Sequence, residues 1–314
     1  MTNLIQKPNN KITKNQGSIN LAYQTPIDPR VIFNYLDISE STKQDYLSRI
    51  DYFINFIKSE GYNFNLFINY KKHLEKRTDY SISTKNKYLA TAKIFLKEAN
   101  RQGLIRADLT QNVKGFKQIK KHKKTGLNDQ EITLLANDIS KLEDTPANAR
   151  LKAILSLLIY QGLRQVEITR LDYTDLHLPN QTAFIQGKGQ DDKEMIYLHP
   201  ETSKALKKYI KLNKISDGAL FTSRSNNNKK QRLTTRAIRG IVKNTLNKIG
   251  IDNSTHGFRH YFTTNLIKRY KGDLLEIASL TRHKSLEMLQ VYNDNIRKQN
   301  DLPKYYEAFN LVKF

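Results

Sequence analysis

The sequence of 314 residues lacks cysteine altogether, which excludes a disulfide framework and any thiolate metal site. Long apolar runs are missing as well, since the most apolar stretch, residues 153–160, is far too short to cross a bilayer. The N-terminus has no apolar signal-peptide core, and no internal repeat is visible. These absences predict a cytoplasmic protein without a membrane partner.

Acidic residues are few. The chain has 30 Asp and Glu and 53 Lys and Arg, which gives a formal net charge of +23. An excess of this size concentrates polyanions around a protein and is typical of nucleic-acid binding. A ribosome-associated protein or one on an anionic membrane would show the same excess, but nucleic acid is the favoured partner. The length and the 38% hydrophobic fraction predict about two folded domains.

The first part of the chain predicts an arm and a small helical domain. Residues 1–28 are rich in Asn, Lys and Gln without an apolar period, which is typical of a flexible arm. Residues 29–113 contain three amphipathic stretches, which begin near positions 41, 64 and 83. Ser41 and Gln44 have the spacing of a capping box for the first stretch, and Gly61 is expected to end it.

A basic segment without a single acid, residues 114–125, separates this domain from the rest of the chain. Two interpretations are compatible: a solvated linker, and a linker that lies against the phosphates of a nucleic acid. The lysines expected to bind DNA here are Lys114, Lys117, Lys120, Lys121, Lys123 and Lys124.

Residues 126–300 predict a second, mainly helical domain. Asn128 and Asp129 are expected to cap its first helix, and the apolar stretch 147–160 predicts a helix central to its core. Between positions 171 and 198, short β-prone runs surround a Gly-Lys-Gly turn, which predicts a hairpin or small sheet. After Pro200 the pattern predicts helices at about 201–213, 233–249, 258–270, 273–281 and 285–292. The predicted fold is therefore mainly α with a small β element (α+β), followed by a tail at residues 301–314.

Two of the side chains suited to phosphate chemistry come early in this domain. Arg164 ends a Gly-Leu-Arg turn after the most apolar helix, where a guanidinium on a packed scaffold can hold phosphate oxygens. The plainer interpretation is a surface arginine paired with Glu167. Lys188 occupies the hairpin turn, with Lys193 close behind, although a lysine in such a turn is ordinarily only solvated.

Four more candidates follow near the C-terminus. In a helix His256 and Arg259 would share a face and could address one phosphate, whereas His260 is less well placed. His283 and Tyr292 come next, and a phenol is a usable nucleophile. Because the chain has 17 tyrosines, Tyr292 alone would indicate only packing. The hypothesis of a phosphate-cleaving site therefore rests on all six candidates together, in their order along the chain.

In order and spacing, this set resembles the tyrosine recombinase family, which includes phage integrases and Xer-like proteins. The stretch 81–103 also resembles the core-binding domain of that family. The resemblance implies a C-shaped clamp on DNA, with residues 29–113 as the core-binding domain and 126–300 as the catalytic domain. It also implies a homotetramer on two DNA sites, a tail that can dock on a neighbouring protomer, a nucleoid location and no cofactor, and it leaves room for an accessory protein.

The resemblance also assigns roles. Arg164 and Arg259 would clamp the scissile phosphate while Tyr292 attacks it. Lys188 would protonate the leaving 5′ oxygen, with Lys193 as the open alternative, and His256 would be the base. His283 would hydrogen-bond the phosphate. A free phenol has a pKa near 10, so its ionisation at neutral pH costs roughly 4 kcal/mol, which nearby guanidiniums and a base can reduce.

One departure from the family pattern concerns Arg282. Family members usually have Leu-Gly before the last histidine, whereas Thr281 and Arg282 precede His283 here, and Arg282 is expected to be a further phosphate contact. The predicted activity is site-specific recombination through a 3′-phosphotyrosyl intermediate at Tyr292, for integration, excision or dimer resolution. The alternatives are DNA relaxation of the type IB topoisomerase kind and a non-catalytic DNA-binding protein.

Overall fold

The structure is a computed structural model that describes residues 28–118, 126–187, 189–224, 231–270, 273–283 and 285–307. The chain divides into two compact units, Met1–Ile119 and Lys120–Phe314. Several predictions fall outside the described residues, namely the arm up to residue 27, the end of the tail from residue 308, Lys188, Lys120, Lys121, Lys123 and Lys124.

The first unit is helical, as predicted. Its elements are the 3-10 helix η1 (Pro29–Tyr35) and the helices α1 (Glu40–Glu60), α2 (Leu66–Glu75) and α3 (Ile82–Arg101). The N-cap of α1 is Ser39, whose side chain accepts from the amide of Thr42, so the capping box expected at Ser41 is wrong. Gly61 ends α1 with a φ of 76°, a backbone conformation that favours glycine.

The start of the basic segment is attached to this unit. The Asn86 side chain on α3 accepts from the amide of Phe116 at 2.8 Å and donates to its carbonyl at 3.0 Å. Phe116 packs against the apolar core of the unit. Lys114 and Lys117 on either side are exposed, as cations expected to meet DNA must be.

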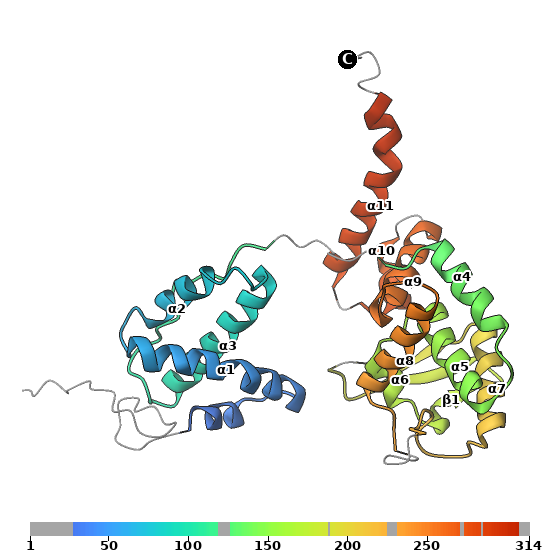
Figure 1. Ribbon diagram of the computed structural model, residues 1–314, viewed down its shortest axis with the longest axis horizontal. Coiled ribbons are helices and arrows are strands. Elements are labelled where there is room, and N and C mark those ends of the chain that lie inside the picture. The colour runs from blue at the N-terminus through green and yellow to red at the C-terminus, as the bar shows by residue number, and fades with distance from the viewer. Residues whose placement is uncertain are drawn as a thin grey trace, which may run out of the picture. The chain divides into compact units, whose positions relative to one another are not determined.

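The second unit is helical with one small sheet (Figure 1). In chain order its elements are α4 (Asp129–Ser140), α5 (Pro146–Tyr160), α6 (Gln165–Arg170), η2 (Tyr173–Asp175), β1 (Leu176–His177), β2 (Thr182–Gln186), β3 (Lys193–Tyr197), α7 (Pro200–Asn213), α8 (Thr235–Lys248), α9 (Thr255–Arg269), α10 (Leu274–Thr281) and α11 (Leu286–Glu307). This confirms the predicted mainly α fold with a small β element.

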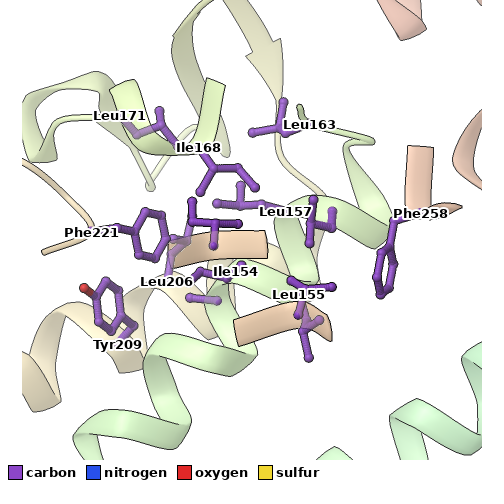
Figure 2. Close-up of a cluster of buried hydrophobic side chains, with 14 of the residues drawn as sticks. Ile154, Leu155, Leu157, Leu163, Ile168, Leu171, Leu206, Tyr209, Phe221 and Phe258 are labelled. Carbon is purple, nitrogen blue, oxygen red and sulfur yellow. The ribbon is translucent and has the colours of Figure 1, made fainter. Parts of the chain in front are cut away.

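Helix α5 lies at the centre of the second core, as its apolar sequence predicts. It packs against both α7 and α9. Figure 2 shows its side chains among those of neighbouring elements, with Ile154 and Leu157 near Leu206 and Phe221. Each such side chain contributes about 1.5–3 kcal/mol when fully buried. This core fixes the turn that follows α5, where Arg164 lies.

The sheet is antiparallel in the order β1-β2-β3. Thr182 pairs with Tyr197 at one end of the β2–β3 ladder, and Gln186 pairs with Lys193 at the other. The turn between them contains Gly189 with a φ of 68°. The two-residue period of a strand places Glu194 and Lys193 on opposite faces of β3.

Three helices differ from the predicted ranges. Helix α9 begins at Thr255 rather than near 258, so it includes His256. Helix α6 was not predicted, because six residues are too few to show an apolar period. Helix α11 continues to Glu307, so the first residues of the expected tail are helical. Among the residues that the structure describes, no helix combines the length and apolarity needed to cross a membrane.

Candidate active site

Five of the six predicted catalytic residues lie in the described part of the second unit, on three separate segments. These segments are the turn between α5 and α6, the first turn of α9, and the stretch from the end of α10 into α11. A cleft of about 590 Å³ opens between the first and last of them and the β2–β3 hairpin. It is lined by Arg164, Glu167, Gly187, Gln190, Glu194, Ala278, Ser279, Arg282, His283, Ser285 and Met288.

Arg164 is held at the N-terminus of α6 by a buried acid. Its Nη1 donates to Oε1 of Glu167 at 2.7 Å, and its backbone amide donates to Oε2 at 2.8 Å. The Glu167 side chain is only 1% exposed, whereas 34% of the Arg164 side chain is exposed. The pair named as the plainer interpretation therefore exists, but its acid is buried and its arginine faces the cleft.

Arg259 connects the three segments. Its Nη1 donates to the carbonyl of Gly162 at 2.8 Å, and its Nη2 donates to the carbonyl of Thr281 at 2.5 Å. The residue is 3% exposed, and burial lowers the pKa of its guanidinium to about 9, with Arg164 and Arg282 adding to the effect. A mainly protonated guanidinium at this depth is a strong site for an anion.

His283 is neutral and has a defined tautomer. Burial first, and then the charge of Arg259 and other nearby cations, lower the pKa of its imidazole to about 3. Its Nδ1 lies 2.6 Å from Oγ1 of Thr281, and that hydroxyl donates to the carbonyl of Ile277. Nδ1 must therefore carry the proton, which leaves Nε2 as an acceptor, 3.5 Å from Nη2 of Arg259.

Tyr292 is buried on α11, with 6% of its surface exposed. Its ring packs with Ile267, Ile277 and Leu289, and burial raises the pKa of its phenol to about 12, an effect that the charge of Arg259 opposes. The ring centroid of His260 lies 4.9 Å from that of Tyr292.

His256 and His260 lie one turn apart on α9. Their ring centroids are 4.6 Å apart in an edge-to-face arrangement. His256 is exposed, while His260 is buried between His256 and the Tyr292 ring. His260, which the sequence pattern placed less well for a phosphate contact, thus packs against the ring of the predicted nucleophile.

Two site residues were underestimated from the sequence. The only signal for Glu167 was an acid three residues after Arg164, which does not reveal burial. Arg282 was expected to contact a phosphate, and it does line the cleft. Its guanidinium, however, donates to protein carbonyls, to Gln161 at 3.2 Å and to Leu280 at 3.3 Å. The expected DNA contact of Arg282 stays a prediction.

The β2–β3 hairpin contributes Gly187, Gln190 and Glu194 to the lining of the cleft. Lys188 at its tip is not among the described residues, but Gly187 and Gln190 beside it line the cleft. Lys193 faces the other way and forms an ion pair with the buried carboxylate of Asp175. In the described ranges, no three His, Asp or Glu side chains gather as ligands for a metal ion.

Comparison with known proteins gives a consistent result. The tyrosine recombinase XerC of Lactobacillus delbrueckii subsp. bulgaricus is 27% identical over 237 residues, which cover 72% of this chain and 77% of that protein. The tyrosine recombinase XerD of Listeria innocua is 28% identical over 279 residues, which cover 84% of each chain.

Solved structures share the fold. A post-cleavage complex of the XerH site-specific recombinase with its palindromic difH substrate superposes with a TM-score of 0.70 at 20% identity, over 87% of this chain and 80% of that one. A lambda integrase dimer bound to a COC′ core site gives a TM-score of 0.64 at 13% identity, over 84% and 92%. The sequence profile of the phage integrase family matches residues 127–299, more than half of the chain. The chain therefore belongs to the phage integrase family of tyrosine recombinases.

Proposed function

We propose that this protein is a site-specific DNA recombinase that cuts and rejoins DNA through a 3′-phosphotyrosyl intermediate at Tyr292. The observation that carries the proposal is the convergence of Arg164, Arg259, His283 and Tyr292, which come from segments far apart in the sequence. Arg259 alone bonds to two of these segments, through Gly162 and Thr281. The names of the sequence relatives support the same activity.

In the proposed reaction, Oη of Tyr292 attacks the scissile phosphorus as the bond to the 5′ oxygen breaks. The phenol proton passes to His256, and Lys188 gives a proton to the departing 5′ oxygen. Arg164 and Arg259 neutralise charge that develops on the non-bridging oxygens. A 5′-hydroxyl of a second strand then attacks the phosphotyrosine and restores both the DNA backbone and the phenol. Neither an oxidant nor ATP is needed, because one phosphoester replaces another.

The pKa of Tyr292 shows how much help the phenol needs. With a pKa of about 12, ionisation at pH 7 costs about 7 kcal/mol, compared with roughly 4 kcal/mol for a free phenol. Removal of the proton in the transition state and the positive charge of Arg259 both reduce that cost. A bound phosphate would also oppose the cations that lower the pKa of His283, so its Nε2 could take up a proton and donate to the phosphate.

The ion pair of Lys193 with Asp175 supports Lys188 as the general acid. A lysine on the far face of β3 that is tied to a buried carboxylate is not free to follow a leaving group. Lys188 is flanked by Gly187, which lines the cleft, and by Gly189. The hairpin tip is therefore the favoured source of the proton.

The proposed partner is double-stranded DNA, bound by a C-shaped clamp made of the core-binding domain (29–113) and the catalytic domain (126–300). The cations proposed to contact its backbone are Lys114, Lys117, Lys120, Lys121, Lys123 and Lys124. We further propose a homotetramer on two DNA sites, assisted by contacts from the tail (301–314), with an accessory protein as an additional participant. Complexes of structural neighbours with DNA, among them a lambda integrase tetramer on a Holliday junction, support this proposal.

A suicide DNA substrate, nicked so that the cleaved fragment diffuses away, tests the proposal. Wild-type protein should accumulate a covalent protein–DNA product, and Tyr292→Phe should form none. Tyr270→Phe, which removes a phenol from the same unit, is the matched control and should cleave like wild type. Covalent product from the Tyr292→Phe protein would refute the assignment. Relaxation of supercoiled DNA without strand exchange would favour the topoisomerase alternative, and a wild-type protein that does not cleave would favour the non-catalytic one.

A further inference from the structure

Arg282 adopts a backbone conformation that L-residues avoid. It follows the last residue of α10 with φ 56° and ψ 45°, in the left-handed region. The Cβ of an L-residue makes this conformation strained, whereas glycine adopts it readily. A glycine would therefore suit the backbone better, so the interactions of the arginine side chain must offset the strain.

The Arg282 side chain turns inward and is only 8% exposed. Nη2 bonds to the carbonyl of Gln161, next to Gly162, whose carbonyl accepts from Arg259. The same Nη2 lies 3.6 Å from Oε2 of Glu167. Nε is buried without a hydrogen-bond partner, an additional cost of placing the guanidinium here.

Glu167 is thus shared by two arginines that differ in exposure. Arg164 bonds to Oε1 at 2.7 Å and has 34% of its side chain exposed to the cleft. Arg282 lies beside Oε2 and is almost fully enclosed. Only Arg164 can turn toward a phosphate in the cleft without first leaving the protein interior. If Arg164 were the sole cation near Glu167, that movement would leave a buried carboxylate without a counter-charge, which is costly.

We infer that Arg282 is a positioning residue that neutralises Glu167, so that Arg164 is released to bind the scissile phosphate. This inference rests on the recombinase function proposed above. It assigns Arg282 an indirect role through the carboxylate, in contrast to a direct phosphate contact. Glu167 holds Arg164 in place before DNA binds, and Arg282 takes over the carboxylate as Arg164 turns to the phosphate.

The test is a double-mutant cycle of Arg282→Gly with Glu167→Gln, measured as single-turnover cleavage of a suicide substrate at saturating protein. In the wild-type background Arg282→Gly should slow cleavage about 10- to 100-fold, the loss expected for an uncompensated charged hydrogen bond. DNA affinity should change less than threefold. In the Glu167→Gln background the same substitution should change the rate less than threefold, and Arg282→Lys, which keeps the charge, should recover part of the rate.

An equal loss in both backgrounds would show that Arg282 only holds the turn at Gln161. A loss of DNA affinity as large as the loss of rate would show a direct phosphate contact. Either result overturns the inference. Failure of the proposed function looks different, because wild-type protein would then form no covalent product in any background.

Thermal unfolding of the same four proteins is a second measurement that does not depend on activity. Arg282→Gly should lower the unfolding temperature when Glu167 is present. In the Glu167→Gln background it should raise that temperature, because it then removes a buried cation that has lost its partner. A change of the same sign in both backgrounds contradicts the shared-carboxylate arrangement.

Discussion

Substitution of Gly126 by alanine should disturb both the stability of the second unit and its chemistry. A Cβ at position 126 would lie 2.5 Å from Cβ of His260, and 3.3 Å from both the carbonyl oxygen of Gly257 and the amide of Tyr261. Carbon atoms pack best at about 3.5–4.0 Å, so the new methyl would be about 1–1.5 Å too close to Cβ of His260 on α9. The atoms it meets are a Cβ and backbone, which cannot rotate aside.

The size of the effect follows from this geometry. Overpacking typically lowers the free energy of unfolding by about 1–3 kcal/mol. Alanine also reduces the conformational freedom of the unfolded chain, which offsets about 0.4–1 kcal/mol of that loss. The net loss of roughly 1–2 kcal/mol corresponds to a decrease of about 2–8 °C in the unfolding temperature of a unit of this size. Displacement of His260, whose ring contacts Tyr292, should also slow cleavage, because a 1 Å misplacement can cost about 100-fold.

Thermal unfolding and single-turnover cleavage of a suicide substrate measure these two effects. Gly240→Ala is the matched control, because nothing lies within 4 Å of a Cβ added there, within α8. It should raise stability by roughly 0.5–1 kcal/mol and leave cleavage unchanged. The reasoning is refuted if Gly126→Ala unfolds and cleaves like wild type.

Three further predictions concern the core, the imidazole and the hairpin. Phe221→Ala should destabilise the second unit by about 3–5 kcal/mol, while Phe184→Ala at an exposed position should cost less than about 0.5 kcal/mol in chemical unfolding. The folded protein lowers the pKa of His283 to about 3, whereas the free imidazole of the unfolded chain has a pKa of about 6.5. Below about pH 6.5 only the unfolded chain binds this proton, so the folded state loses stability as pH falls. The loss of stability below that pH should therefore be less steep in His283→Asn than in wild type. An NMR titration that finds the imidazole of folded His283 protonated at pH 5 would contradict this prediction. Lys188→Met should slow cleavage of an ordinary duplex strongly, and Lys193→Met should chiefly lower the unfolding temperature by freeing Asp175; the reverse pattern would identify Lys193 as the acid.

The sequence predicts most of the helices because their apolar spacing is local information. Asn128 caps α4 with a reciprocal bond to Glu131, and the apolar stretch of α5 lies in the core. The start of α9 was missed because its first turn begins with the polar residues Thr255 and His256, which do not belong to an apolar stripe. A helix start without apolar residues gives no periodic signal in the sequence.

Some features of the candidate site could likewise be predicted from the sequence, and others could not. The order of Arg164, Arg259, His283 and Tyr292 along the chain was enough to expect that they meet. The burial of Glu167, the inward turn of Arg282 and the contact of His260 with Tyr292 could not be predicted. Each depends on carbonyls and side chains from segments that become neighbours only after folding, and single-residue patterns do not carry that information.

The attachment of Phe116 to α3 limits how far the two units can separate. Asn86 attaches the chain to the first unit as far as Phe116. In the second unit, the amide of Leu127 bonds to the carbonyl of Gly257 on α9. Eleven residue steps join these points, so the reach of the connector is at most about 36–40 Å. A tether this short keeps one unit at an effective concentration on the order of millimolar near the other. If both units bind DNA, as the proposed clamp requires, a unit that releases the DNA should rebind before the whole chain dissociates.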